Sequence, residues 1–299
     1  MKGIVTIIAG LLLMGSVAQA SEFGFYTFPD FDKVIYGDDD RVDLYQISNP
    51  NWVSRARSTV ALVKNSSLRP VENGFTYQQN TLGQRMGLCE NERFREQPSL
   101  AFCSGFLVAP NMMVTAGHCI QNQSQCNATS FVFDFALSGQ GRVPAGFPRK
   151  NVYRCKQVLG QRLVGTGEDW AIVEIDRAVT DRRPLPLRRS GVPEVNTPLA
   201  VAGHPSGLPL KVAAGAGVRS VNRSGYLVAN LDTYGGNSGS AVFNLRTGNV
   251  EGILVRGERD YQRSRTGCTQ SVRCENNSCR GEDVTLITRV CGINGQPCN

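Results

Sequence analysis

The amino-acid sequence predicts an all-β fold, either a barrel or a sandwich, and three observations lead to this prediction. The apolar runs are short and rich in β-branched and aromatic residues, which is typical of strands. Glycine, proline, asparagine or serine separates these runs, as expected for turns. Few windows show the period of an amphipathic helix. The expected strands are Thr59–Val63, Phe102–Val108, Phe131–Phe135, Trp170–Ile175, Leu199–Ala202, Ala241–Phe243 and Val250–Val255.

The beginning of the chain predicts a secretory signal peptide. Lys2 precedes the apolar run Ile4–Met14, and the alanines at positions 18 and 20 suit cleavage after Ala20. A membrane anchor is the alternative, but the apolar run is shorter than the ~20 residues that a spanning helix needs. No later segment of the sequence is long and apolar enough to span a membrane. We therefore expect a secreted protein, either extracellular or periplasmic.

The composition is that of an ordinary globular protein, with 299 residues of which 41% are hydrophobic and 19% charged. Such a chain can form one large or two small domains. The stretch Asp181–Pro198 is rich in proline and arginine and divides the expected strands into two sets. We therefore interpret this stretch as the connector between two barrels.

The chain is basic, with a formal net charge of +7. Loss of Lys2 with the signal peptide would leave +7 − 1 = +6. Arg182, Arg183, Arg188 and Arg189 cluster in the connector, but no nucleic-acid-binding motif accompanies them. We expect a solvated basic surface that attracts acidic partners, and no nucleic-acid partner.

Ten cysteines agree with export, because disulfides persist outside the reducing cytosol. A strand and a turn separate Cys103 from Cys119, and a hairpin-like return would join them and fix the loop that ends at Cys119. Cys126–Cys155 is a second candidate pair. Five cysteines lie on each side of the connector. Complete pairing therefore requires a bridge between the halves, and Cys89 is the candidate for its N-terminal end.

A zinc site at Cys268, Cys274 and Cys279 is the alternative use of these thiols. Their spacing lacks a CxxC pair, and the whole chain holds only two histidines. Structural zinc sites usually need four such ligands at short, regular spacings. We therefore expect no metal ion and no cofactor.

Three local sequences suit the parts of a nucleophilic catalyst. His118 lies in the segment TAGHC, Asp169 begins the segment DWAIV, and Ser238 lies in the segment GGNSGS. A serine hydroxyl is a poor nucleophile at neutral pH and needs an adjacent base. That base needs a carboxylate to fix its tautomer and to stabilise its charged form. The chain order His, Asp, Ser is that of the chymotrypsin-like serine proteases.

Together with the segments GHP at 203–205 and VEGILVRG at 250–257, these sequences resemble the chymotrypsin/trypsin clan of secreted serine proteases. Within the clan, the chain is most similar to bacterial glutamyl-endopeptidase-like (trypsin-like) peptidases, from about Val34 to Val290. The resemblance implies two six-stranded antiparallel β-barrels (chymotrypsin-like) with the active site in the cleft between them. It implies an N-terminal arm at 34–57, a first barrel at 58–180, and a second barrel at 181–299 that includes the cysteine-rich C-terminal region.

The same resemblance assigns the catalytic roles. It makes His118 the general base and acid, Asp169 the carboxylate that orients it, and Ser238 the nucleophile. It also makes the backbone N–H groups of Gly236 and Ser238 the oxyanion hole. Consecutive glycines support this role, because they adopt positive φ values that can point two N–H groups at one oxygen. Asn237 stands where trypsins carry an aspartate that pairs with the new N-terminus on activation, so we expect that ion-pair switch to be absent.

Other residues compete for these roles. Glu168 is a neighbouring carboxylate, which we expect on the solvated surface because Asp169 matches the motif. His204 would give the subtilisin order Asp, His, Ser, but its segment lacks the flanking pattern of that class. An α/β-hydrolase is disfavoured because no histidine follows Ser238. A non-catalytic adhesin or binding protein built on the protease fold stays open, since a fold alone does not establish catalysis.

Specificity is expected from Asp232, which lies six residues before Ser238. In this clan that position forms the base of the pocket for P1, the substrate residue before the scissile bond. An aspartate there implies cleavage after Arg or Lys, unless its side chain turns away or pairs internally. Glutamyl endopeptidases instead bind an acidic P1 residue with Thr or Ser and a histidine. Thr233 matches the former, Leu254 occupies the histidine position, and Arg256 is the cation that would restore acidic specificity.

The segment Val34–Arg41, VIYGDDDR, resembles the mature amino terminus of the glutamyl endopeptidases. We therefore expect a zymogen whose propeptide, Ser21–Lys33, is removed by cleavage after Lys33. The Arg57–Ser58 bond is the second candidate site. The mature protein is expected to be a monomeric serine endopeptidase that cuts proteins or peptides through an acyl-enzyme intermediate.

Overall fold

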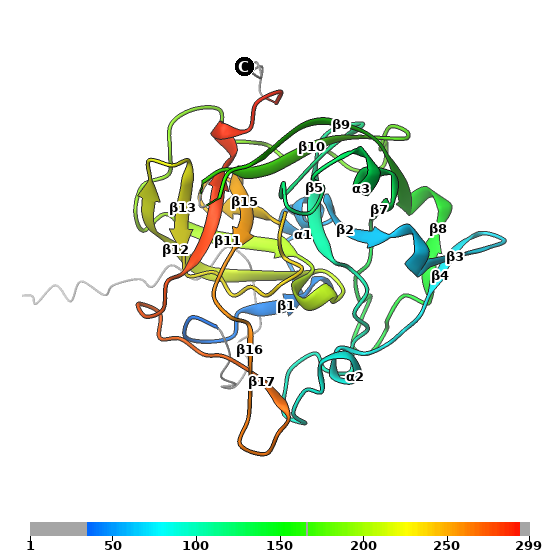
Figure 1. Ribbon diagram of the computed structural model, residues 1–299, viewed down its shortest axis with the longest axis horizontal. Helices are drawn as coiled ribbons and strands as arrows, with labels where there is room; N and C mark the ends of the chain where they lie inside the picture. Colours follow the sequence, from blue (N-terminus) through cyan, green and yellow to red (C-terminus); the bar gives the residue numbers. More distant parts are fainter. Residues whose placement is uncertain (1–34, 166, 294–299) are drawn as a thin grey trace, which may run out of the picture.

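The computed structural model describes residues 35–165 and 167–293. In these ranges the chain forms two antiparallel β-barrels that lie next to each other, with only short helices (Figure 1). The predicted signal peptide, the predicted propeptide with its cleavage site after Lys33, and Cys298 fall outside the described residues. Across the two described ranges, no helix is both long enough and apolar enough to span a lipid bilayer.

Six strands close the first barrel, and every neighbouring pair is antiparallel. Its interior is apolar, with Phe106, Phe131 and Ile172 fully buried. Such β-branched and aromatic residues pack well on a pleated surface. In hydrogen-bonded order, the strands are β10 (Asp169–Ile175), β6 (Met112–Thr115), β5 (Cys103–Ala109), β2 (Thr59–Lys64), β7 (Thr129–Val132) and β9 (Val152–Leu163).

A second set of six antiparallel strands forms the other barrel. In hydrogen-bonded order, they are β12 (Lys211–Asn222), β11 (Pro198–Gly203), β14 (Ala241–Asn244), β15 (Val250–Arg256), β18 (Glu282–Leu286) and β13 (Tyr226–Ala229). The barrel closes because β13 also pairs with β12. Leu199, Val242 and Val284 are buried in its core. The two closed barrels confirm the predicted fold class.

The N-terminal arm packs on the second barrel, although it precedes the first barrel in the sequence. Its strand β1 (Arg41–Asp43) pairs with β12 (Figure 1). Helix α1 (Pro50–Ala56) follows, and its Trp52 packs edge-on against Phe243 of β14, with ring centroids 5.8 Å apart. The arm therefore ties the beginning of the described chain to its C-terminal half.

The remaining elements are short and lie outside the barrel strands. One small sheet contains β3 (Leu68–Val71), β4 (Gly74–Tyr77) and β8 (Gly146–Pro148), and another contains β16 (Tyr261–Arg263) and β17 (Thr269–Ser271). The helical turns are α2 (Leu82–Met86), α3 (Gln123–Asn127), η1 (Leu44–Gln46), η2 (Asn65–Ser67), η3 (Arg149–Asn151), η4 (Pro205–Gly207) and η5 (Ile287–Arg289).

Four disulfides join cysteines of the described ranges. They are Cys103–Cys119, Cys126–Cys155, Cys89–Cys268 and Cys274–Cys279. The first two lie within the first barrel, and Cys89–Cys268 links the two halves of the chain. Cys291 is also disulfide-bonded. Because Cys268, Cys274 and Cys279 are all oxidised, they offer no thiolate to a zinc ion.

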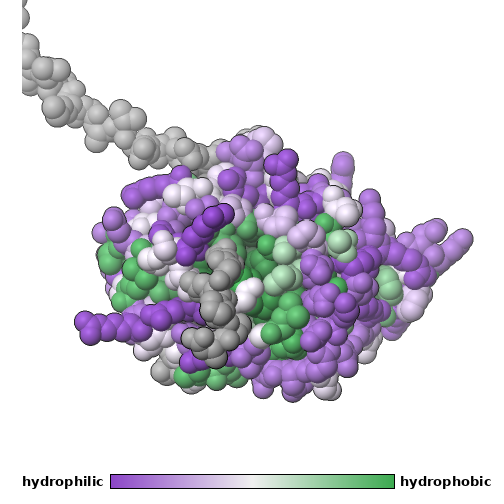
Figure 2. All heavy atoms as spheres, turned by 90° about the horizontal axis from the view of Figure 1, so that it is seen from above, coloured by the Kyte–Doolittle hydropathy of each residue, from purple (hydrophilic) through white to green (hydrophobic). Residues whose placement is uncertain are grey.

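Ion pairs within the protein hold the arginine-rich connector. Arg182 lies 3.1 Å from Asp134, which follows β7 of the first barrel. Arg188 pairs with the buried Glu251 on β15 of the second barrel. The connector is therefore fastened to both barrels. The face of the molecule drawn in Figure 2 is mostly hydrophilic, with apolar residues gathered near its centre.

Candidate active site

The register of two strands brings His118 and Asp169 together. Strand β6 pairs with β10, and Thr115 lies opposite Ala171. In an antiparallel pair, the residues that follow Thr115 therefore lie beside those that precede Ala171. Gly117 permits the close approach, because a Cβ atom at this position would collide with the backbone of β9 and β10.

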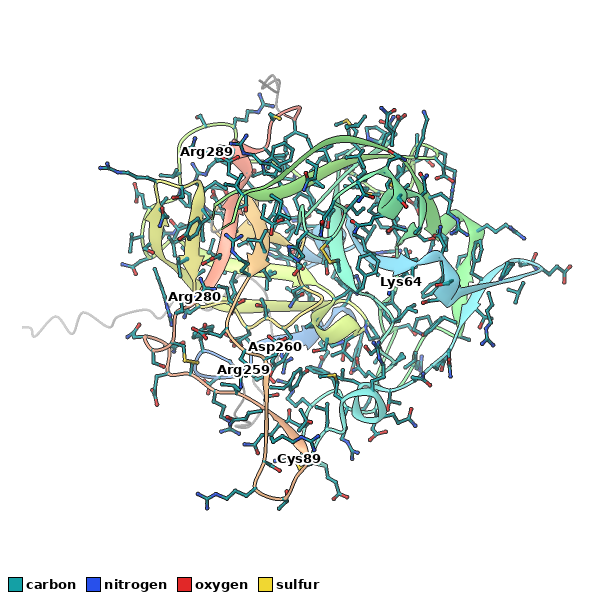
Figure 3. The ribbon with its side chains drawn as sticks, in the orientation of Figure 1. Lys64, Cys89, Arg259, Asp260, Arg280 and Arg289 are labelled. Atoms are coloured by element: carbon teal, nitrogen blue, oxygen red, sulfur yellow. A yellow bond between two sulfur atoms is a disulfide. The ribbon has the colours of Figure 1, made fainter. Side chains whose placement is uncertain are left out.

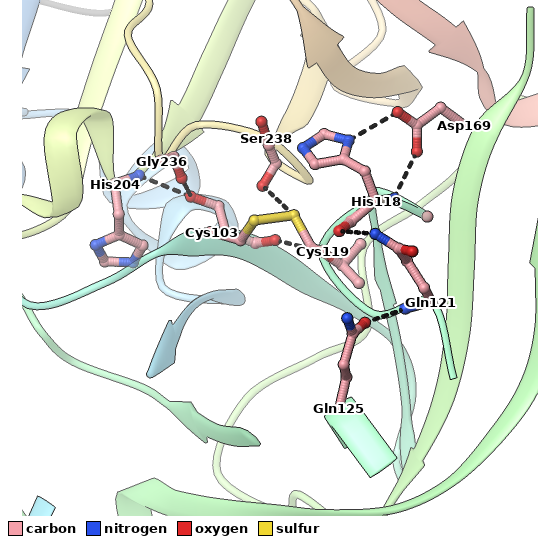
Figure 4. Close-up of a disulfide and its surroundings, with 12 residues drawn as sticks. Cys103, His118, Cys119, Gln121, Gln125, Asp169, His204, Gly236 and Ser238 are labelled. Carbon is pink, nitrogen blue, oxygen red and sulfur yellow. Dashed lines mark hydrogen bonds and ion pairs between the residues drawn. A yellow bond between two sulfur atoms is a disulfide. The ribbon is translucent and has the colours of Figure 1, made fainter. Parts of the chain in front are cut away.

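Asp169 holds His118 with two hydrogen bonds (Figure 4). Nδ1 of His118 lies 2.7 Å from Oδ2 of Asp169, and the backbone N–H of His118 donates to Oδ1 at 3.0 Å. Asp169 is 1% exposed, whereas the side chain of His118 is 35% exposed. A buried carboxylate at Nδ1 favours the tautomer with its proton there and leaves Nε2 able to act as a base.

Ser238 comes from the second barrel, on the turn that precedes β14. The backbone N–H of Ser104 on β5 donates to the carbonyl oxygen of Ser238 at 2.8 Å. The sulfur of Cys119 lies 3.7 Å from the same oxygen, and Figure 4 shows Ser238 next to this disulfide and to His118. Among the described residues, no hydrogen bond joins the Ser238 hydroxyl to His118, and such bonds are often long before substrate binds. The three residues therefore gather where the two barrels meet.

The turn before Ser238 presents two N–H groups. Gly236 has a φ of +94°, and a Cβ atom there would lie 2.6 Å from the carbonyl oxygen of His204. Only glycine fits this position. Within the described ranges, neither the N–H of Gly236 nor that of Ser238 donates a hydrogen bond. Two unpaired N–H groups beside a serine hydroxyl are what a developing oxyanion needs.

Asn237 holds this turn from within. It is 2% exposed, and its N–H donates to the carbonyl oxygen of Tyr234 at 2.9 Å. Its Oδ1 accepts a hydrogen bond from the Ser240 hydroxyl at 3.2 Å. Neutral hydrogen bonds therefore fix the conformation of the turn without an ion pair at Asn237.

His204 is built into the protein interior. It is 1% exposed, its Nδ1 lies 2.9 Å from the carbonyl oxygen of Leu208, and its ring stacks on Phe135 with centroids 5.8 Å apart. Its Nε2 has no hydrogen-bond partner among the described residues. Burial is the main reason that the pKa of His204 falls from 6.5 to about 4. This histidine is packed as a neutral structural residue.

Replacement of His204 by glutamine is expected to reduce the loss of folding stability at acid pH. Between pH 4 and 6.5 the unfolded chain binds a proton at His204 and the folded protein does not. The stability contributed by the neutral ring is therefore lost as the pH falls through this window, by about 3 kcal/mol between pH 7 and pH 4. We would measure the free energy of unfolding of His204→Gln in urea at several pH values. It should not show this loss at low pH. His118→Gln, which keeps His204, is the matched control, and an equal acid slope in both variants would contradict the assignment.

Two further charged residues lie beside Asp169, and each has another partner. Oε2 of Glu168 lies 3.0 Å from Nε of Arg162, so this carboxylate is turned away from His118. Arg256 has its Nη1 3.9 Å from Oδ2 of Asp169 and its Nε 3.1 Å from Oδ2 of Asp283. The charge of Arg256 is therefore shared between two carboxylates of the protein.

Asp232 pairs internally, which is the alternative that the sequence left open. It is 4% exposed, and its two oxygens accept the backbone N–H groups of Tyr36 and Asp40, each at 2.9 Å. Burial is the main cause that raises the pKa of Asp232 well above its usual range. The carboxylate therefore holds the N-terminal segment, and these contacts give no support to the predicted role of Asp232 in the P1 pocket.

The other predicted specificity residues are also buried. Thr233 is 2% exposed, and its hydroxyl donates to Oε2 of Glu282 at 2.7 Å. Leu254 belongs to the core of the second barrel. Glu282 was not predicted as a site residue, because its segment matches no motif. The only signal was an acidic residue in the last apolar strand.

One group of side chains in the described ranges has metal-ligand spacing, namely Cys103, His118 and Cys119. Its two cysteines are joined in a disulfide. A disulfide supplies no thiolate, so only one nitrogen donor remains.

Comparisons with known proteins agree with this geometry. A family model described as the trypsin-like peptidase domain matches residues 103–253. The glutamyl endopeptidase of Bacillus licheniformis is 27% identical over 152 residues, which cover 48% of this chain and 46% of that protein. The match thus spans about half the length of that relative.

Two solved structures are also similar to this chain. The Vibrio cholerae VesB protease has a TM-score of 0.49 at 16% identity, over 83% of this chain and 64% of that chain. A Glu endopeptidase in complex with MPD has a TM-score of 0.48 at 16% identity, over 85% of this chain and 95% of that chain.

Proposed function

The chain belongs to the family of trypsin-like peptidase domains, and from this premise we propose that it is a serine endopeptidase with Ser238 as the nucleophile. His118 is the general base and acid, and Asp169 orients it. The observation that carries the proposal is the pair of unused N–H groups at Gly236 and Ser238, next to the His118–Asp169 pair. Both N–H groups are free to donate to a substrate oxygen, as acyl transfer requires.

In the first half of the reaction, Ser238 Oγ attacks the carbonyl carbon of the scissile bond while Nε2 of His118 takes the hydroxyl proton. Asp169 stabilises the imidazolium that forms and remains ionised. The negative charge on the carbonyl oxygen falls beside the N–H groups of Gly236 and Ser238. Loss of one such donor typically costs about 2.7–4 kcal/mol of transition-state stabilisation.

In the second half, His118 gives its proton to the nitrogen of the leaving amine, the C–N bond breaks, and an acyl group remains on Ser238. A water molecule then attacks the acyl carbon, and His118 accepts a proton from this water. The ester bond breaks, His118 returns the proton to Ser238 Oγ, and the new carboxylate leaves.

We propose cleavage after Arg or Lys, and cleavage after Glu is the second candidate because the curated relative is a glutamyl endopeptidase. The contacts argue against the second candidate. The Thr233 hydroxyl already donates to Glu282, Leu254 offers no donor, and Arg256 is paired with Asp283. A substrate carboxylate would find no free cation there and would lie close to Glu282.

Labelling with a fluorophosphonate tests the proposed function. We expect one equivalent to attach to Ser238, located by peptide mass spectrometry, and no attachment in Ser238→Ala. A folded wild-type protein that stays unlabelled and cleaves no peptide would favour the alternative, a binding protein or adhesin built on the protease fold.

Export and processing are part of the same proposal. Disulfides fit an oxidising compartment, and we propose a secreted zymogen that loses its signal peptide after Ala20 and its propeptide after Lys33. The new terminus, Val34, would lie two residues before Tyr36, whose N–H is held by Asp232. Edman sequencing of the secreted protein should begin at Val34. A start at Ser21 or Ser58 would contradict this part of the proposal.

A further inference from the structure

Glu282, the first residue of β18, lies against the two segments that lead to the predicted specificity residues. Oε2 accepts the hydrogen bond from the Thr233 hydroxyl at 2.7 Å. On the other side, a Cβ atom at Gly257 would collide with the Glu282 carboxylate. Gly257 directly follows Arg256 and β15, so the carboxylate is wedged between the segment before Ser238 and the end of β15.

No cation neutralises this carboxylate within the described ranges. Glu282 is 4% exposed, and its other oxygen accepts the backbone N–H of Glu258 at 3.2 Å. Arg280, whose charge acts on Glu282, is bound to Asp283 at 2.7 Å. Burial of an unpaired charge is costly, and burial is the main cause that raises the pKa of Glu282 to about 8.

A second carboxylate, that of Asp260, lies beside the segment that leads to Ser238. Oδ2 of Asp260 accepts the N–H of Gly235 at 2.7 Å, three residues before Ser238. Burial raises the pKa of Asp260 to about 6. Its negative charge also disfavours ionisation of Glu282. Figure 3 shows Asp260 on the same side of the second barrel as Arg280.

The N-terminal segment contributes a buried hydroxyl, that of Tyr36, whose ionisation is disfavoured by the charge of Glu282. Tyr36 is 3% exposed, and its hydroxyl has no hydrogen-bond partner among the described residues. Burial raises the pKa of Tyr36, and the charges of Glu282 and Glu258 raise it further. Among the described residues, the cluster therefore combines two carboxylates that form no ion pair with a phenol hydroxyl that has no hydrogen-bond partner. The guanidinium of Arg219 lies over the Tyr36 ring, 4.6 Å from its centroid. A cation with several N–H donors would satisfy all of these groups.

We propose that Glu282 is the specificity-determining residue of this peptidase, and that its carboxylate binds the guanidinium or ammonium group of a P1 arginine or lysine. Thr233 orients the carboxylate, and Asp260 adds a second negative charge. Asp232 then has a structural role, because its oxygens hold the N-terminal segment. The inference rests on the proposed function and names the residue that selects its substrate.

The test compares Glu282→Gln with Asp232→Asn in the processed protein. Both changes remove one buried ionisable carboxyl group and conserve the shape of the side chain. The substrates are fluorogenic peptides that differ only at P1, which is Arg, Lys, norleucine or Glu. In Glu282→Gln, the ratio of kcat/KM for Arg to that for norleucine should fall roughly 10²-fold, because a buried charge pair is lost. In Asp232→Asn this ratio should stay at the wild-type value.

A fluorophosphonate without a P1 side chain separates the possible failures. If the wild-type protein neither reacts with it nor cleaves any peptide, the proposed function has failed. If the wild type reacts and Glu282→Gln, equally reactive, still prefers Arg, only the present inference is overturned. If only Asp232→Asn loses the preference for Arg at P1, Asp232 and not Glu282 is the residue that determines specificity.

Benzamidine binding provides a measurement that does not depend on how the two charge variants fold. Calorimetry on Ser238→Ala should show benzamidine affinity rising roughly tenfold per pH unit up to about pH 8. The reason is that the cation binds the ionised form of Glu282. The other titratable groups facing this carboxylate are Glu258, Asp260, Arg280 and Tyr36. Absence of binding, or an affinity independent of pH between 6 and 8, would overturn the proposal.

Discussion

Replacement of Ser238 by alanine is expected to lower kcat for a peptide substrate by a factor of about 10⁶, with little change in KM. In the proposed mechanism this hydroxyl forms the acyl-enzyme, and without it only the proposed oxyanion N–H groups and substrate binding remain. These retain a rate roughly 10³–10⁴-fold above that of uncatalysed hydrolysis. The measurement is steady-state cleavage of the preferred fluorogenic peptide by purified, processed protein.

The matched control for this variant is Ser240→Ala, two residues further along the chain. Ser240 is buried and donates to Asn237, so its loss should affect the stability of the turn more than the chemistry. Comparable activity of Ser238→Ala and wild type would show that another residue is the nucleophile. Equal losses in both variants would indicate that the turn has collapsed, which thermal unfolding would reveal.

Replacement of Asp169 by asparagine is expected to lower kcat by about 10⁴-fold at neutral pH. The amide keeps the shape of the carboxylate but can donate a hydrogen bond to Nδ1 of His118, which moves the ring proton to Nε2. Nε2 of His118 then faces Ser238 with a proton, whereas a general base must face it with a lone pair. Because Asp169 also accepts the backbone N–H of His118 at 3.0 Å, the loop should keep its place.

Glu168→Gln serves as the matched control, since it removes a carboxylate from the adjacent residue. Glu168 is paired with Arg162, so activity should stay close to that of the wild type. A large loss of activity in Glu168→Gln, together with a small loss in Asp169→Asn, would show that Glu168 and not Asp169 orients His118. Activity should be measured with the P1 residue fixed, so that substrate preference does not enter the comparison.

The sequence predicted the fold class because most barrel strands carry a strong local signal. Strand β2 and strand β10 are nearly continuous runs of buried apolar residues, and such runs are recognisable without any structure. Strand β12 was not foreseen, because its sequence KVAAGAGVRSVN is rich in alanine and glycine, which have low strand propensity. Its pairing with β11, β13 and β1 decides its conformation instead.

The candidate catalytic residues were predictable because each one stands in a distinctive local segment. The contacts around the proposed P1 residue Glu282 were not, because the residues that make them meet only in space. Thr233 and Glu282 are 49 positions apart in the sequence. Tyr36 is 196 positions from Asp232, the carboxylate that holds its N–H. A motif places an aspartate six residues before the serine, but it cannot say which distant N–H groups its oxygens will meet.

The arginine-rich connector exposes Arg189 in front of Ser190, so a peptidase that cuts after arginine is expected to nick itself at this bond. Such a nick would separate the chain into an amino-terminal and a carboxy-terminal fragment. The fragments would stay together, because the Cys89–Cys268 disulfide and the β1–β12 pairing cross the break. Autolysis would therefore yield a two-chain protein that migrates as one species until it is reduced. The disulfide and the arm that precedes the first barrel would thus hold a nicked molecule together.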